Sequence, residues 1–219
     1  MNQSTSEVLK ILKREGICIL RGYWDKQKCD QAIKEISQIP PQRFSQGQGG
    51  DLRVRPTEPY STKARDFIND SFIFDIAKKY SDCHDPENVQ TNVVKFIQDN
   101  PMDSGGGWHL DSLKPAQFKS MIYLTDVTSE NGPFMFLRGS KKKSSKFPFF
   151  SNFRLENSFI NDNFSSDKIV EVTGAAGTCV LFDSTYVHRG KEIASGTRIA
   201  MTTYWYPIEK IKDLPEWKK

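Results

Sequence analysis

The chain has 219 residues, with 31 lysines and arginines against 27 aspartates and glutamates, a formal net charge of +4 and three histidines. This length fits one domain. Aromatic residues make up 12% of the chain, enough to fill a core, which excludes a disordered protein. No apolar run approaches the roughly 18 residues of a membrane-spanning helix. The mild charge gives no indication of DNA binding.

The N-terminus and the cysteines bear on the cellular compartment. The first residues, MNQSTSEVLKILKREG, are polar and helical, unlike the basic and then apolar pattern of a secretory signal. The four cysteines are scattered, with no CxxC pair of the kind found in zinc ribbons and thioredoxins. We therefore expect a cytoplasmic protein with reduced thiols.

Helical patterns dominate residues 1–87. Apolar residues at helical spacing, preceded by capping residues such as Ser4 and Asp25, predict the helices. A stretch rich in Gly, Gln and Pro predicts a long loop. The predicted elements, in chain order, are a helix over 5–15, a buried strand over 17–20, a helix over 25–39, the loop over 40–62 and a helix over 64–80.

From residue 88 the pattern changes to short β-rich runs separated by turns such as Asn131-Gly132-Pro133. The predicted strands cover 89–97, 107–112, 118–127, 133–137, 168–173, 178–183 and 197–206. Several short strands at this spacing predict a small sandwich or barrel. We expect a single domain over 1–219, with its core over 88–206, an irregular insert over 138–167 and a tail over 207–219.

Two separated segments carry the chemistry. His109 and Asp111 lie two residues apart, so on an extended backbone their side chains share one face. His188 follows a predicted strand far along the chain. Two histidines and one carboxylate suit a non-haem Fe(II) site with open coordination positions. Zinc hydrolases also use such a set, but the chain has no HExxH helix.

Arg198 lies ten residues beyond His188, on a predicted strand. A guanidinium can hold a carboxylate through two hydrogen bonds. Arg198 is therefore a candidate for holding the far end of a short dicarboxylate that chelates the metal. The third histidine, His84, lies in a polar segment, SDCHDPEN, and is expected in a surface turn.

In this order, the HxD motif, the distant histidine and Arg198 resemble the Fe(II)/2-oxoglutarate-dependent oxygenases. The stretch from Glu130-Asn131-Gly132-Pro133 to Gly139-Ser140-Lys141 is similar to the phytanoyl-CoA dioxygenase-like branch, and so is the opening GICILRGYWDKQKCDQAI. The resemblance covers residues 10–206. Arg138 and Lys141 stand where that branch usually has proline and histidine.

The resemblance implies a mainly β fold, with N-terminal helices packed on a double-stranded β-helix (jelly-roll, cupin-like) core. It implies that His109, Asp111 and His188 bind Fe(II). Since Asp111 is present, the halogenase variant, which lacks this carboxylate, is disfavoured. The implied activity is hydroxylation of a small molecule, coupled to decarboxylation of 2-oxoglutarate to succinate and CO2.

The resemblance also implies how the other reactants are used. 2-Oxoglutarate is expected to chelate the metal, with its distal carboxylate on Arg198. Gln90 and Asn92, on one face of the strand before HxD, and Tyr123, on the strand after it, are further candidates for the cosubstrate pocket. Dioxygen is the other cosubstrate, and ascorbate is a candidate reductant.

Two alternative functions stay open. The first is a peptide or protein hydroxylase, because residues 123–127 (YLTDV) resemble prolyl hydroxylases. The second is a cupin-like module that binds a metal or ligand without turnover. Release of succinate distinguishes the second from an enzyme.

The partners of the chain are indicated only in outline. The basic run from Arg138 to Lys146 is either a solvated surface or a contact for an anionic group on the substrate, which Arg53 and Arg55 would also meet. Nucleic-acid demethylases usually carry a second arginine where this chain has Tyr204, so nucleic acid is not an expected partner. The sequence does not indicate an oligomeric state.

Overall fold

The computed structural model describes residues 3–47, 50–96, 107–111, 117–151 and 153–207, without the side chains of residues 84, 142 and 143. The expectations for the side chains of His84, Lys142 and Lys143, and for almost all of the tail, lie outside the described residues. Within the described ranges, no helix is long and apolar enough to cross a membrane.

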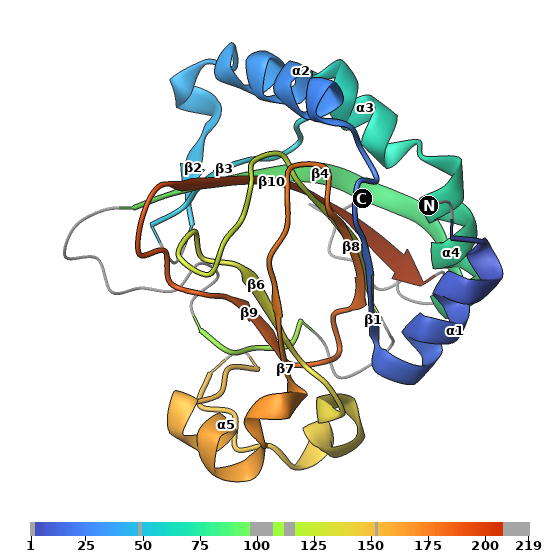
Figure 1. Ribbon diagram of the computed structural model, residues 1–219, viewed down its shortest axis with the longest axis vertical. Coiled ribbons are helices and arrows are strands. Elements are labelled where there is room, and N and C mark those ends of the chain that lie inside the picture. Colours follow the sequence, from blue (N-terminus) through green and yellow to red (C-terminus); the bar gives the residue numbers. More distant parts are fainter. Residues whose placement is uncertain (1–2, 48–49, 97–106, 112–116, 152, 208–219) are drawn as a thin grey trace.

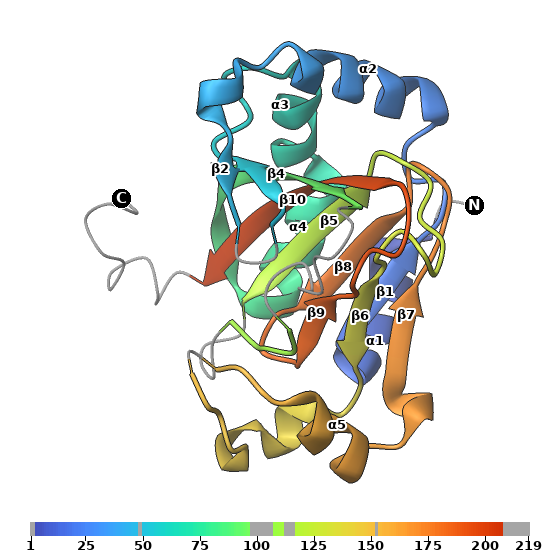
Figure 2. The same ribbon diagram turned by 90° about the vertical axis from the view of Figure 1, so that its left-hand side faces the viewer.

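The core consists of two antiparallel sheets (Figures 1 and 2). In spatial order, the large sheet contains β1 (Ile17–Leu20), β8 (Cys179–Asp183), β5 (Phe118–Tyr123), β10 (Thr197–Pro207), β4 (Cys83–Lys95), β3 (Leu52–Val54) and β2 (Ser45–Gln46). The small sheet contains β7 (Ile169–Val172), β6 (Phe134–Leu137) and β9 (His188–Gly190). This arrangement confirms the predicted jelly-roll core.

The N-terminal helices cover the outer face of the large sheet, as expected. They are α1 (Thr5–Glu15), α2 (Lys26–Ser37), α3 (Thr62–Ile68) and α4 (Ser71–Ser81). Their apolar faces form one continuous core with the outward side chains of the sheet, including Phe118, Ile122, Leu181 and Trp205. In both views α2 and α3 lie at one end of the molecule (Figures 1 and 2).

The opposite face of the large sheet points toward the small sheet. Side chains alternate between the two faces along each strand. Phe118 and Ile122 pack under the helices, whereas Tyr123 packs with Phe134, Val180 and other residues between the sheets. We call this the inner face, and it carries the candidate site.

Three predictions for the N-terminal half need correction. The loop over 40–62 contains η1 (Pro41–Arg43) and also β2 and β3, which extend the large sheet. The charged side chain of Arg53 made β3 resemble a loop in the sequence, although Val54 of the same strand is buried. The helix over 64–80 is two helices, because the Asp70 carboxylate accepts a hydrogen bond from the Ile73 amide at 3.0 Å and begins α4. β4 begins at Cys83, earlier than predicted, so residue 84 lies in a strand and not in the expected turn.

The C-terminal half also differs in detail. The predicted strand over 107–112 is only a bridge at His109, and residue 112 lies outside the described residues. β9 was not predicted, because its sequence, HRG, has no strand pattern. The insert over 138–167 contains η2 (Ser140–Lys146) and α5 (Asn157–Asn163), and η3 (Ser166–Lys168) follows at its end.

Candidate active site

His109 and His188 are brought together by the backbone. His109 donates its amide hydrogen to the His188 carbonyl at 3.0 Å, and the reverse bond measures 2.8 Å. These two residues therefore form a hydrogen-bonded antiparallel pair, which places their side chains on one side. Their ring centroids are 4.5 Å apart.

Asp111 completes the cluster. Its amide donates to the Ser184 carbonyl at 3.0 Å, which ties the HxD segment to the end of β8. One ligand atom from each of His109, Asp111 and His188 lies within 4.8 Å of the others. The structure thus joins the three residues that the sequence singled out as metal ligands.

Both imidazoles are turned in the same way. His109 Nδ1 lies 2.8 Å from the Gly107 carbonyl oxygen, and His188 Nδ1 lies 2.9 Å from the Tyr186 carbonyl oxygen. Since a carbonyl can only accept, Nδ1 carries the proton in each ring and Nε2 keeps its lone pair. Gly107 has φ +87°, a backbone conformation that favours glycine.

The pKa values of the three side chains also suit the binding of a cation. Burial lowers the pKa of His109, and burial together with His109 lowers that of His188 to about 3. Burial alone would raise the pKa of Asp111, but Lys119, His188 and His109 together outweigh burial and hold that pKa well below its ordinary value. Two neutral imidazoles and one carboxylate form a donor set that fits a divalent metal.

Lys119 is a site residue that the sequence analysis missed. Its Nζ lies 2.6 Å from Asp111 Oδ2, and its side chain is only 8% exposed. Burial would lower the pKa of Lys119, but its interactions with Asp111 and Tyr204 together outweigh burial and raise that pKa. The sequence could have identified Lys119 by its position inside the apolar strand FKSMIYL, because a lysine is almost never buried without a partner.

Arg198 lies on β10, buried on the inner face. Burial lowers its pKa, and the negative charge of Asp51 opposes that effect. Asp51 is fully buried at the start of β3 and pairs with Arg53, whose Nε lies 2.5 Å from Asp51 Oδ2. The Arg198 guanidinium is therefore set in a buried, polar part of the sheet.

The other cosubstrate candidates lie on the same face. Gln90 Nε2 donates to Asn92 Oδ1 at 2.7 Å, and Asn92 stands opposite Ala200 in the ladder. The Tyr123 hydroxyl donates to the Val172 carbonyl at 3.0 Å and accepts from the Phe134 amide at 2.9 Å. The Tyr123 hydroxyl therefore bonds the large sheet to the small one.

The insert forms a wall beside the histidines. Leu110 donates to the Phe153 carbonyl at 3.2 Å, and Leu155 donates to the Trp108 carbonyl at 2.9 Å. Arg154 pairs with His109 between these bonds. Burial lowers the pKa of Arg154, and the nearby positive charge of Arg53 lowers it further. Arg154 thus lies beside the cluster and within electrostatic range of Arg53 on β3.

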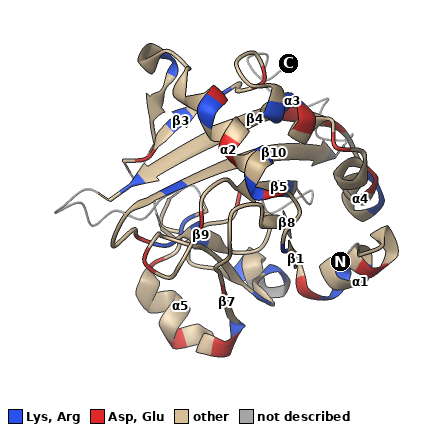
Figure 3. Ribbon diagram, turned by 45° about the horizontal axis from the view of Figure 1, so that its top comes forward, with Lys and Arg blue, Asp and Glu red and all other residues tan. Residues whose placement is uncertain are grey.

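Other basic residues have structural partners. Arg55 forms an ion pair with Glu87. Lys141 Nζ lies 2.6 Å from Oδ2 of the fully buried Asp183, so it ties the start of the insert to β8. Basic and acidic residues are interspersed along α1, α2 and α4, so these helices present no face of a single charge (Figure 3).

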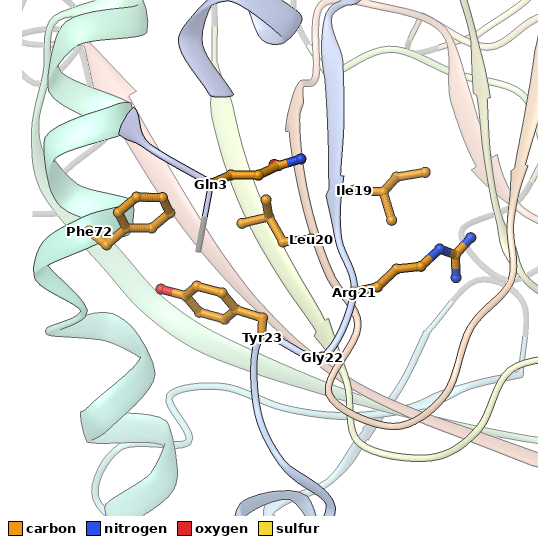
Figure 4. A pocket seen from close by; sticks show the side chains of 7 residues that line it. All are labelled: Gln3, Ile19, Leu20, Arg21, Gly22, Tyr23 and Phe72. Atoms are coloured by element: carbon orange, nitrogen blue, oxygen red, sulfur yellow. The ribbon is translucent and has the colours of Figure 1, made fainter. Parts of the chain in front are cut away.

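One cavity, of about 630 Å³, lies elsewhere, beside β1 and α4 (Figure 4). It is lined by Gln3, Ile19, Leu20, Arg21, Gly22, Tyr23 and Phe72. None of these residues belongs to the cluster around His109. The Tyr23 hydroxyl donates to Asp70 Oδ2 at 2.7 Å, which joins the segment after β1 to the start of α4.

The fold is similar to those of several solved structures. One is the epimerase SnoN in complex with Fe3+, alpha ketoglutarate and nogalamycin RO, with a TM-score of 0.70 and 16% identity over 97% of this chain and 90% of SnoN. Another is HygX from Streptomyces hygroscopicus with nickel, 2-oxoglutarate and hygromycin B bound, with a TM-score of 0.64 and 16% identity over 92% of this chain and 87% of HygX.

A third similar structure is a prolyl hydroxylase from Trichoplax adhaerens in complex with a peptide fragment of hypoxia inducible factor. Its TM-score is 0.66, with 15% identity over 97% of this chain and 93% of that chain. At such identities these likenesses establish a shared fold. No curated protein sequence matches the chain.

The family comparison is more specific. Residues 12–200 match the model of the phytanoyl-CoA dioxygenase (PhyH) family. The matched region includes both histidines of the cluster, Asp111 and Arg198, and it agrees with the resemblance seen in the sequence. The chain therefore belongs to the phytanoyl-CoA dioxygenase family.

Proposed function

We propose that the cluster of His109, Asp111 and His188 binds Fe(II) and that the protein hydroxylates a small-molecule substrate. As a member of the phytanoyl-CoA dioxygenase family, the chain is a 2-oxoglutarate-dependent oxygenase. The observation that carries the metal assignment is the shared orientation of the two imidazoles, each with Nδ1 on a carbonyl oxygen and Nε2 available. When bound, Fe(II) and 2-oxoglutarate supply the oxidising chemistry, which yields succinate and CO2.

The protein contributes by binding, orienting and excluding water. We assign the distal carboxylate of 2-oxoglutarate to Arg198, with Gln90 and Asn92 beside it on the inner face. Burial favours this pairing, because a charge-assisted hydrogen bond gains strength away from water. The solved relatives SnoN and HygX contain alpha ketoglutarate or 2-oxoglutarate in their structures, which supports the same cosubstrate here. Dioxygen as cosubstrate and ascorbate as reductant complete the proposal.

For the substrate, we propose a small molecule with an anionic group. Arg154 supports this proposal, because it pairs with His109 beside the cluster, and Arg53 of β3 lies close enough to lower the pKa of Arg154. A carboxylate or phosphate on the substrate, placed beside Arg154, would add a favourable charge interaction. SnoN and HygX carry antibiotics, nogalamycin RO and hygromycin B, in their structures.

A peptide substrate is the second candidate, favoured by the similarity to the Trichoplax prolyl hydroxylase with its bound peptide. One assay separates the two candidates. The protein is loaded anaerobically with Fe(II), and succinate release from 2-oxoglutarate is measured in air with panels of anionic metabolites and of proline-containing peptides. Stimulation by a metabolite supports the proposal, and stimulation only by peptides contradicts it. If His188→Ala releases as much succinate as the wild type, the assigned site is wrong.

A further inference from the structure

A row of paired residues crosses the small sheet and continues beyond it into the insert. Phe136 of β6 stands opposite His188 of β9, and His188 pairs with His109. On its other side, His109 pairs with Arg154 of the insert. Residues that stand directly opposite each other in an antiparallel pair project to the same side. Arg154 therefore projects from the face that carries both histidines.

The backbone hydrogen bonds on either side of Arg154 fix this register. Leu110 donates to the Phe153 carbonyl at 3.2 Å, and Leu155 donates to the Trp108 carbonyl at 2.9 Å. Arg154 and its histidine partner lie between these two bonds, so they form a non-hydrogen-bonded pair. In this type of pair the side chains are closest, with Cα atoms about 4.5 Å apart.

The residues next to this pair in the chain pack on the other face. Trp108, Leu110 and Leu155 belong to one apolar cluster, which also contains Ile160 of α5. Side chains alternate between the two faces of an extended segment. Since Leu155 packs under the insert, Arg154 directly before it lies on the opposite face, where it is half-buried.

The backbone is unusual immediately before Arg154. Phe153 has φ +59°, in the left-handed region that favours glycine. A bulky residue keeps such a conformation only when its surroundings impose it, and residues of this kind concentrate at functional sites. The Phe153 ring packs edge-on against Phe149, with centroids 5.5 Å apart. The insert is thus held in a strained conformation where it presents Arg154.

Electrostatic interactions agree with this placement. Burial lowers the pKa of Arg154, the charge of Arg53 lowers it further, and the charge of Asp111 opposes both effects. The charge of Arg154 is in turn one of the causes, after burial, that lower the pKa of His109. The guanidinium therefore lies within electrostatic range of two residues of the cluster.

We propose that Arg154 is a specificity-determining residue, which binds a carboxylate or phosphate of the substrate beside the metal-binding cluster. The inference rests on the proposed function and deepens it by assigning the residue that selects the substrate. A guanidinium holds either group through two hydrogen bonds, and partial burial strengthens them. Because Arg154 is the direct neighbour of His109, the acid group is bound next to the reacting part of the substrate. A neutral analogue of the same shape is not selected.

The test measures anion binding to the metal-free protein by NMR of the imidazole groups, of which the chain has three. The variants His109→Gln and His188→Gln assign the signals. Inorganic phosphate, butanoate and the neutral butanamide are titrated at constant pH and ionic strength. Phosphate and butanoate should shift the His109 signals saturably, and butanamide should not. Arg154→Met and Arg154→Gln, two uncharged variants, should each weaken binding of both anions at least about tenfold.

Arg189→Met is the matched control. Arg189 directly follows His188, but its guanidinium lies over the ring of Trp108, at 4.6 Å from the centroid. That ring belongs to the apolar cluster on the opposite face. Removing this charge should leave the affinity for phosphate unchanged. Arg198→Met should also leave it unchanged, which separates the substrate anion from the distal carboxylate of 2-oxoglutarate.

Several outcomes would overturn the proposal. They are His109 signals that phosphate does not shift in the wild type, an equal response to butanamide, and undiminished phosphate binding by a folded uncharged variant of Arg154. Loss of phosphate binding in Arg198→Met alone would also overturn it, because the anion would then occupy the site of the cosubstrate. Failure of the proposed function is recognised separately, because this titration requires neither metal nor turnover.

Discussion

His109 and His188 form a two-way backbone pair, with amide-to-carbonyl distances of 3.0 and 2.8 Å. The pair joins the HxD segment to the first residue of β9. Each ring is then oriented by a carbonyl two residues before it, that of Gly107 or Tyr186. The imidazoles are therefore oriented by hydrogen bonds to the backbone.

The first prediction concerns stability without metal as a function of pH. Burial lowers the pKa of both imidazoles below the ordinary value of 6.5, that of His188 to about 3, so the unfolded chain binds more protons in this range. The contribution of the two histidines to the free energy of unfolding should be fully present above about pH 6.5. It should decrease as the pH drops toward 3, with a slope of up to roughly 1.4 kcal/mol per pH unit for each histidine.

Urea denaturation at several pH values measures this slope. Asp111 acts in a lower range, because its lowered pKa stabilises the folded state above about pH 3.8 and this contribution disappears as the pH falls further. The variant His188→Gln should show a shallower slope between pH 6.5 and 4. An equal slope in this variant and the wild type would contradict the assignment of a neutral, buried His188.

The second prediction concerns proton release on metal binding. At pH 7 both imidazoles are neutral and Asp111 is ionised, so a divalent metal has almost no proton to displace from these three groups. Calorimetric titration with Mn(II) in two buffers of different ionisation enthalpy should therefore give nearly equal heats. Release of one or more protons per metal would show that a ligand is protonated in the free protein.

The third prediction concerns Arg198. Arg198→Met should weaken 2-oxoglutarate binding at least tenfold while leaving Mn(II) affinity within about twofold, because a buried charged hydrogen-bond pair is worth roughly 1.5–3 kcal/mol. The affinity of Arg198→Lys for 2-oxoglutarate should lie between those of the wild type and Arg198→Met, since lysine keeps the charge but not the two-point contact. Arg21→Met, at the cavity beside β1, serves as the control. Unchanged 2-oxoglutarate affinity in Arg198→Met would place the cosubstrate elsewhere.

The fourth prediction concerns the network of Asp183. Asp183→Asn keeps the shape but turns an acceptor of four donors into a group that also donates, at a fully buried position. We expect a loss of about 3 kcal/mol in the free energy of unfolding, measured with urea. The exposed pair of Lys26 and Asp30 gives the comparison, because Asp30→Asn should have little effect.

The fifth prediction concerns the cysteines. Burial raises the pKa of Cys18, Cys29 and Cys83 to about 11 and that of Cys179 well above its ordinary value. All four thiols are buried and unpaired. A thiol reagent at pH 8 should therefore react slowly with the folded protein and with four thiols after unfolding. Rapid reaction of a thiol in the folded protein would contradict the burial of that residue.

Much of the site could be predicted from the sequence because its order along the chain is specific. His109 and Asp111 two residues apart, His188 after a strand and Arg198 ten residues later were enough to indicate the cluster. The stretch from Glu130 to Lys141 and the N-terminal opening then indicated the family. The structure shows why this order suffices. Each residue lies on or beside a strand of the core, and the register of those strands brings distant segments to one face.

Other features could not be predicted, for identifiable physical reasons. β9 has only three residues, and it is a strand because His188 and Arg189 pair with β6, which is a long-range effect. Arg53 was predicted to lie in a loop, because the pairing of β3 with β4 depends on a distant part of the chain. Lys119 was overlooked because its charge suggested exposure, whereas its partner Asp111 comes from a segment outside β5.

The central claim is that the His109, Asp111 and His188 cluster binds Fe(II) and 2-oxoglutarate together. The most direct measurement is an anaerobic titration of the protein with Fe(II) and 2-oxoglutarate, followed by the weak visible charge-transfer band of the chelate. The account predicts a saturable band in the wild type and in His84→Ala, which removes the remaining histidine, and its loss in His109→Ala and His188→Ala. No band in the wild type, or an undiminished band in His109→Ala, would contradict the account.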